Sequence, residues 1–136
     1  MVKLIMGLKG SGKTKKLVEM VKQAVEEGHG DVVCIEKDKN LTYDIPYSAR
    51  LIHASEYGIN SNVLLRGFLC GLHAGNYDIT HVFIDNFYKM LDDTSEDGVG
   101  DFLDWLDEFS TRDHVTFVIS ATFSPESAGE RLRKYF

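Results

Sequence analysis

The sequence predicts one α/β domain over residues 1–136, a three-layer sandwich in which helices cover both faces of a mainly parallel five-stranded sheet. Two observations predict this fold class. Short, almost continuously apolar runs alternate with longer segments whose apolar residues recur every three or four positions. Continuous apolar runs are typical of parallel strands buried on both faces, and the period of the longer segments is that of a helix with one buried face.

Each predicted element has its own boundary signals. Strands are predicted over residues 2–6, 31–36, 50–54, 81–85 and 116–122. Helices are predicted from Lys13 to a stop at Gly28, from the Asn60-Ser61-Asn62 cap to about Gly75, and over residues 99–109. Ser124 and Pro125 resemble a further helix start, because proline is favoured at the first helical position. The polar residues 37–49 and the acidic residues 88–98 are predicted to be loops.

Composition and charge restrict the possible partners. Hydrophobic residues make up 43% of the chain, which is enough for a packed core. The formal net charge of −6 argues against non-specific binding to nucleic acid, which needs a basic face. No apolar run approaches the length of a membrane span and no signal peptide is recognised, so we expect a cytoplasmic protein with no membrane partner. Cys34 and Cys70 lie in apolar stretches and are predicted to be buried thiols.

The strongest motif lies between the first predicted strand and the first predicted helix. It reads Gly7-Leu8-Lys9-Gly10-Ser11-Gly12-Lys13-Thr14 and matches G-x-x-x-x-G-K-[ST]. Its glycines allow turns that direct amide N–H groups into a concave anion site, and the helix dipole strengthens that site. Lys13 is expected to reach the β- and γ-phosphates of a nucleoside triphosphate, and the Thr14 hydroxyl to bind Mg²⁺. The alternative is a glycine-rich turn without a ligand, and Lys9 and Ser11 either line the site or face solvent.

Two later strands end in polar residues that suit the same site. Asp85 follows Val82-Phe83-Ile84, and an acid at the carboxyl end of a buried strand is where a phosphate-bound Mg²⁺ finds its second protein ligand. The alternative is an aspartate that caps a turn. Ser120 and Thr122 end the last strand, and either hydroxyl is a candidate to sense the γ-phosphate or hold a water. The alternative is a hydroxyl that satisfies a backbone group.

The loop at residues 7–14 together with Val82-Phe83-Ile84-Asp85 resembles the Walker A and Walker B motifs of the P-loop NTPase superfamily. The strands between the two motifs and the later polar strand are similar to the RecA-like branch. The loop and Ile84-Asp85 also resemble bacterial thymidine kinases, and Ser120-Ala121-Thr122 resembles the Ser-Ala-Thr motif of helicases. The resemblance covers most of the chain and implies a P-loop fold that binds ATP and Mg²⁺. The chain has neither the zinc-binding cysteines of thymidine kinases nor the length for a second motor domain.

One position departs from these families. Thymidine kinases and many RecA-like ATPases have a glutamate base directly after the Walker B aspartate, whereas this chain has Asn86. An amide orients a water but cannot take its proton. If hydrolysis occurs, Glu36 is the candidate catalytic acid and Asp38 a weaker one, although a solvated charge at the strand end is the favoured interpretation of both. No arginine is clearly placed to contact the phosphates as an arginine finger. The candidates are Arg112, Arg131 and Arg133, in this chain or from a second subunit, and a surface position is the favoured interpretation of each.

Three functions remain possible from the sequence, which leaves open whether the chain is an enzyme. The leading one is ATP binding with slow or partner-stimulated hydrolysis, in which Lys13, Thr14 and Asp85 hold MgATP. The second is a non-catalytic nucleotide sensor that controls a protein partner or a homo-oligomer, and the third is a small-molecule kinase. ATP is preferred to GTP because the chain lacks an Asn-Lys-x-Asp pattern.

Two charged segments receive simpler interpretations. Residues 92–108 contain eight acids and no base, and a solvated helix face is preferred to a metal site there. The basic residues 131–134 are expected to meet a partner or a neighbouring acidic face.

Overall fold

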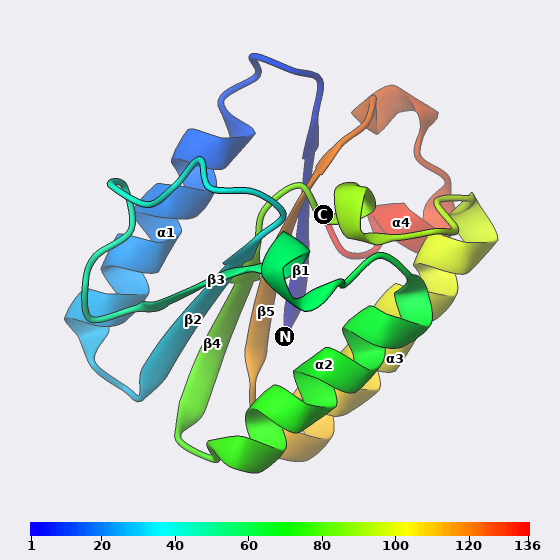
Figure 1. Cartoon of the computed structure of the whole chain (residues 1–136). Helices are drawn as coiled ribbons and strands as arrows, with labels where there is room; N and C mark the ends of the chain where they lie inside the picture. Colours follow the sequence, from blue (N-terminus) through cyan, green and yellow to red (C-terminus); the bar gives the residue numbers. More distant parts are fainter.

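A computed structural model describes all residues from 1 to 136. Its single sheet has five strands, all parallel, in the order β1-β5-β4-β2-β3 (Figure 1). The strands are β1 (Val2–Gly7), β2 (Asp31–Glu36), β3 (Arg50–His53), β4 (Ile79–Ile84) and β5 (Thr116–Thr122). The predicted α/β class with a five-stranded sheet is therefore confirmed, and the sheet is parallel throughout.

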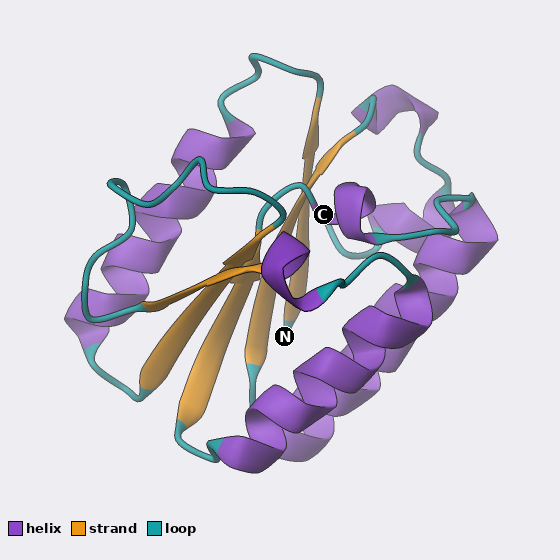
Figure 2. Ribbon diagram, viewed as in Figure 1, coloured by secondary structure: helices purple, strands orange, loops and turns teal.

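Helices cover both faces of this sheet (Figure 2). They are α1 (Lys13–Glu27), α2 (Asn62–Gly75), α3 (Glu96–Asp113) and the short α4 (Glu130–Arg133). One apolar cluster lies between the sheet and α1, and it includes Leu41, Ile45 and Ala49 of the 37–49 loop. The larger cluster lies on the other face and contains the buried side chains of α2, α3 and the C-terminal segment. The sheet is therefore the middle of three layers, with α1 and the 37–49 loop on one face and α2, α3 and α4 on the other.

The strand order brings three distant segments to one edge of the sheet. β5 lies between β1 and β4, with Gly7 opposite Thr122 and Ile84 opposite Ile119. Because parallel strands end at the same edge, the turn after Gly7, the residues after Ile84 and the end of β5 are neighbours. The apolar character of each strand predicts that it is buried but contains no information about which strand lies beside which.

Several predicted boundaries were wrong. The segment 88–98 is not all loop, since a 3₁₀ helix, η2, covers Phe87–Met90 and α3 already begins at Glu96, where the Ser95 hydroxyl accepts the N–H of Gly98. After Ser124 only one 3₁₀ turn forms, over Pro125–Ser127, and the chain becomes helical again at α4. Cys34 is buried as predicted, but Cys70 is exposed, because it lies on the outer side of α2.

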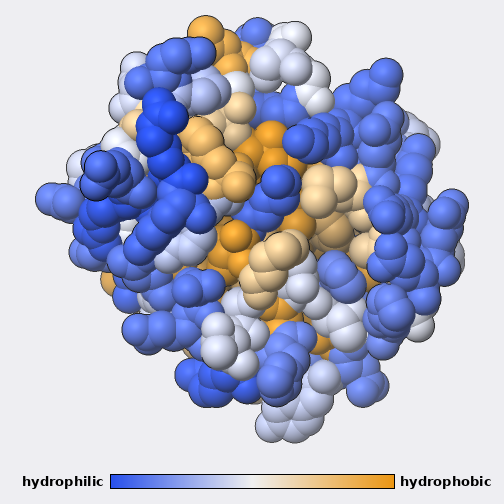
Figure 3. All heavy atoms as spheres, turned by 180° about the vertical axis from the view of Figure 1, so that it is seen from behind, coloured by the Kyte–Doolittle hydropathy of each residue, from blue (hydrophilic) through white to orange (hydrophobic).

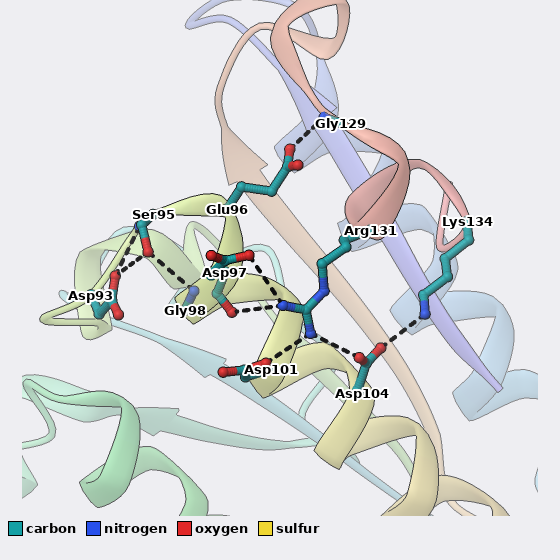
Figure 4. A network of polar contacts seen from close by, with 10 residues as sticks. All are labelled: Asp93, Ser95, Glu96, Asp97, Gly98, Asp101, Asp104, Gly129, Arg131 and Lys134. Atoms are coloured by element: carbon teal, nitrogen blue, oxygen red, sulfur yellow. Dashed lines mark hydrogen bonds and ion pairs between the residues drawn. The ribbon is translucent and has the colours of Figure 1, made fainter.

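The acidic face of α3 is only partly a solvated face, because it holds the C-terminal segment (Figure 4). Arg131 of α4 donates to Asp101 at 2.8 Å and to Asp104 at 2.9 Å. Asp104 also accepts a hydrogen bond from Tyr135 and forms an ion pair with Lys134. These contacts lower the pKa of Asp104 to about 2, and the hydrogen bond from the Tyr135 hydroxyl has the largest effect. The prediction that residues 131–134 meet a neighbouring acidic face is confirmed.

The face seen from behind has hydrophobic side chains near its centre and hydrophilic side chains on both flanks (Figure 3). None of the helices combines the length and the apolar composition that a membrane crossing requires.

Candidate functional site

The loop between β1 and α1 has the backbone that its glycines predict. Gly10 and Gly12 have φ values of +84° and +86°, a region that residues with a Cβ avoid. Gly7 is favoured for a different reason, because a Cβ there would meet the side chain of Ser11, which would have to move. The Ser11 N–H donates to the Leu8 carbonyl, which closes a tight turn. Glycine is thus favoured at three of the eight positions, and the loop forms a tight turn.

The first turn of α1 is open to an anion. Gly12 caps the helix without a side-chain hydrogen bond, and the first turn contains no acid. The N–H groups at this end therefore keep their partial positive charge and lack an internal acceptor. Lys13 is only 9% exposed and forms no ion pair with any acid of the chain. The stem of Lys13 is therefore covered by protein, while its ammonium is not engaged by any acid of the chain and is available to an anion.

Asp85 lies beside the start of α1. Its Oδ1 atom accepts hydrogen bonds from the Ser120 hydroxyl at 2.6 Å and from the Thr14 hydroxyl at 3.2 Å. Asp85 is itself buried, and its N–H donates to the Ile35 carbonyl of β2. The structure thus brings Lys13, Thr14, Asp85 and Ser120 together, as the sequence-based hypothesis of one shared site requires.

Asn86 is held in place by its backbone conformation and by two hydrogen bonds to β5. It adopts φ +51°, a left-handed conformation that asparagine tolerates better than most residues. Its N–H donates to the Ser120 hydroxyl at 2.9 Å, and its side-chain carbonyl accepts from the Thr122 hydroxyl at 2.9 Å. The amide therefore connects β4 and β5 at the mouth of the site. Neither this contact nor the left-handed backbone could be recognised in the sequence.

Glu36 lies at the same edge but has a different role from the predicted one. It is 3% exposed, so the interpretation as a solvated strand-end charge is wrong. Its carboxylate accepts the N–H groups of Asn40 and Leu41 at 2.9 to 3.2 Å and lies 3.4 Å from the His53 ring. These contacts fix the start of the 37–49 loop. Because both oxygens already accept hydrogen bonds, the geometry favours a structural role over that of a base.

A small polar hollow joins Glu36 to Asp85. It is also lined by Lys37, Asp38, Asn40, Asn86 and Lys89. Burial and the nearby charges of Asp85 and Glu36 raise the pKa of the Cys34 thiol, which lies beneath them on β2. The thiol therefore stays protonated and unreactive. Lys89 was missed in the sequence because no motif includes it; η2 carries it to this hollow.

The three candidate arginine fingers are all engaged elsewhere in this chain. Arg112 pairs with Asp113, and Arg131 with the acids of α3. Arg133 donates to the carbonyls of Ala128 and Pro125. None of them takes part in the contacts around Asp85, which agrees with the favoured interpretation of surface residues. Leu8 and Lys9, at the tip of the loop, are exposed.

The side-chain oxygens of Thr14 and Asp85 are too few to bind a metal ion by themselves, so further oxygen ligands would have to come from a bound phosphate and water. No group of three or more His, Cys, Asp or Glu side chains that could hold a metal exists in the structure. Thr14 and Asp85 offer hydroxyl and carboxylate oxygens within 3.4 Å of each other. Mg²⁺ prefers six oxygen ligands and commonly takes one or two from protein and the rest from phosphate and water. The donor set therefore fits Mg²⁺ that arrives with a phosphate.

Comparison of the chain with models of known protein families finds no match, and comparison with curated proteins finds none either. The function is therefore inferred from the geometry of the chain's own residues.

Proposed function

We propose that this chain is a P-loop nucleotide-binding protein that holds a nucleoside triphosphate, preferably ATP, together with Mg²⁺. The main support for this proposal is Lys13, whose side chain is 9% exposed and forms no ion pair, next to the N-terminus of α1, which has no side-chain cap and no acid in its first turn. A triphosphate would give Lys13 the negative partner that no acid of the chain provides.

Each residue of the site has a role in this proposal. The amides of residues 7–14 and Lys13 bind the β- and γ-phosphates. Thr14 and Asp85 hold Mg²⁺, and Ser120 orients the Asp85 carboxylate through its 2.6 Å hydrogen bond. The bound metal ion would neutralise charge on the phosphate oxygens. The position of β5 between β1 and β4 supports an assignment to the RecA-like branch of the P-loop proteins.

Binding is better supported than hydrolysis. The position after Asp85 carries an amide, which cannot accept a proton, and the Glu36 oxygens are occupied by backbone N–H groups. We therefore propose that hydrolysis is slow in the isolated chain and depends on a group from a partner or a second copy.

A nucleotide sensor is the second candidate, and the Asn86–Thr122 contact favours it. Thr122 is followed by Phe123, whose N–H donates to the Gly7 carbonyl, so the contact adjoins the first residue of the loop. The segment that follows is held on α3 through Arg131. A γ-phosphate that displaced the Asn86 amide would therefore act directly on the start of the C-terminal segment.

The test is a calorimetric titration with MgATP of the wild-type chain and of Lys13→Ala. The exposed Lys22, on the same helix, provides the matched control Lys22→Ala. We expect the Lys13 variant to bind at least roughly a hundredfold more weakly, because a charge-assisted contact to a phosphate is lost, and the Lys22 variant to bind normally. Equal binding by all three proteins would rule out the proposed site.

Phosphate release separates the two candidate functions. Release above that of Lys13→Ala supports hydrolysis. Binding without release, accompanied by a nucleotide-dependent change in oligomeric state, supports the sensor.

A further inference from the structure

β1 forms an open edge of the sheet. It pairs only with β5, and its odd-numbered residues face that neighbour, because Phe117 donates to the Met1 carbonyl and Phe123 to the Gly7 carbonyl. In a parallel ladder, residues of the other parity direct their N–H and C=O groups to the opposite side. Val2, Leu4 and Met6 therefore point their backbone groups away from the sheet.

Only one of these outward groups near the phosphate-binding loop has a partner. The Leu4 N–H donates to the Tyr135 carbonyl at 2.7 Å, where the C-terminal segment crosses the edge. The Leu4 carbonyl and both backbone groups of Met6 form no hydrogen bond within the chain. A row of open donors and acceptors of this kind is a template for a further strand.

A groove of about 200 Å³ runs along this part of β1. Its floor is the strand itself, and its two sides differ in chemistry. Lys16 of α1 lies on one side, together with Lys3, which points to the α1 face like Ile5 two residues later. Pro125 and Phe136 lie on the other side, and Phe136 is 43% exposed.

Charge identifies the kind of occupant. Lys3 and Lys16 are the only charged residues that line the groove, and neither forms an ion pair within a chain whose formal net charge is −6. A strand laid along β1 would turn alternate side chains toward the two lysines and toward Phe136. Acidic side chains suit the positions that face Lys3 and Lys16, and apolar side chains suit the positions that face Phe136.

We propose that the β1 groove binds an extended segment of a partner protein in which acidic and apolar residues alternate, and that this segment joins the sheet as an additional strand. Backbone hydrogen bonds to Leu4 and Met6 supply affinity, and the alternating side chains supply specificity. A second copy of this chain fits less well, because pairing β1 with β1 would bring two sets of unpaired lysines together. The inference does not depend on nucleotide binding.

The probe is a fluorescent, end-blocked peptide of sequence Glu-Val-Glu-Val-Glu-Val-Glu, and the matched control peptide replaces each Glu by Lys. Fluorescence anisotropy is measured without nucleotide. We expect the wild-type chain to bind the acidic peptide at least roughly tenfold more tightly than the basic one, and high salt to reduce the difference. Equal affinity for both peptides, or binding of neither, would overturn the proposal.

Two variants locate the binding. The double variant K3E/K16E is expected to reverse the preference and bind the basic peptide more tightly; an unchanged preference would show that another surface binds the peptide. Met6→Pro removes an outward N–H without removing a β1–β5 hydrogen bond, and proline is tolerated on edge strands. Its circular dichroism and thermal midpoint are expected to remain close to wild type while peptide binding falls at least roughly tenfold. Unchanged peptide binding by a folded Met6→Pro chain would contradict strand addition.

Two further measurements separate this proposal from its rivals. Lys13→Ala is expected to bind the acidic peptide as tightly as wild type, even though its nucleotide binding is impaired. Loss of peptide binding in this variant would assign the peptide to the phosphate site. Sedimentation of the chain alone tests self-pairing. A dimer that K3E/K16E or Met6→Pro dissociates would mean that β1 pairs with itself and would overturn the proposed partner.

Discussion

The Thr14 hydroxyl lies 3.2 Å from Oδ1 of Asp85, although 71 residues separate them in the chain. Thr14 belongs to the first turn of α1, and Asp85 follows β4. The contact exists because α1 and the carboxyl end of β4 lie at the same edge of the sheet, with β5 between β1 and β4. Two oxygen atoms that suit Mg²⁺ are thereby placed beside the glycine turn, and Ser120 holds one of them in position.

Removal of the Ser120 hydroxyl is predicted to weaken Mg²⁺-dependent binding. Ser120→Ala deletes a buried hydrogen bond to the Asp85 carboxylate and also removes the acceptor of the half-buried Asn86 N–H. Hydrogen bonds to charged groups contribute about 1.5–3 kcal/mol, so we expect MgATP affinity to fall roughly tenfold or more. Titration with and without Mg²⁺ measures the effect. The exposed Ser48→Ala is the control, and an equal loss in the absence of Mg²⁺ would argue against a metal-positioning role.

A carboxylate at position 86 is predicted to accelerate hydrolysis. Asn86→Glu places a proton acceptor beside Asp85, whereas Asn86→Gln has the same length and no basic group. General bases contribute about 10²–10⁴-fold to rates, and the left-handed backbone at this position reduces the benefit of a longer side chain. We expect the glutamate variant to release phosphate from MgATP at least roughly tenfold faster than the glutamine variant. Equal rates would mean that Asn86 does not limit hydrolysis.

Two glycine-to-alanine changes are predicted to have opposite effects on stability. Gly12 has φ +86°, so Gly12→Ala is expected to cost about 1–2 kcal/mol of the free energy of unfolding. Gly67 lies on an exposed part of α2, and a Cβ there meets no atom within 4 Å. Gly67→Ala is expected to stabilise the chain by about 0.5–1 kcal/mol, because alanine restricts the unfolded chain and favours the helix. Urea denaturation of the two variants measures both signs, and a neutral Gly12→Ala would contradict the turn geometry.

Acid is predicted to loosen the C-terminal segment. The folded-state pKa of Asp104 is about 2, below its ordinary value of 3.8, chiefly because it accepts a hydrogen bond from Tyr135. A lowered pKa contributes stability that is present above pH 3.8 and is lost as pH falls through about 2. The unfolding free energy of Asp104→Asn should therefore depend less on pH across this window than that of wild type.

Urea midpoints measured from neutral pH down to this acid window test the prediction. Asp107 is exposed and forms no hydrogen bond or ion pair, so Asp107→Asn provides the control with the same change of charge. If the two asparagine variants showed the same pH dependence, the loss of stability would have to be assigned to net charge and not to the contacts of Asp104.

Part of the candidate site can be predicted from residue type and from position at the strand ends. The glycine turn, Lys13, Thr14, Asp85 and Ser120 are predicted in this way, and the tertiary structure brings them together. The surroundings of Glu36 and Cys70 were not predicted correctly. Whether a strand-end acid faces solvent or the N–H groups of the next loop depends on how residues 37–41 fold back. Whether a thiol on an amphipathic helix is buried depends on which side of the helix meets the sheet.

The α/β class and the backbone of the loop at residues 7–14 can be predicted from the amino-acid sequence alone. Both depend on local properties, namely the spacing of apolar residues and the freedom of glycine at positive φ. The strand order, the contact of Asn86 with Thr122 and the pairing of Arg131 with α3 become visible only in the folded chain. These features join residues far apart in the chain, and only the packing of helices against the two faces of the sheet determines which of those residues meet.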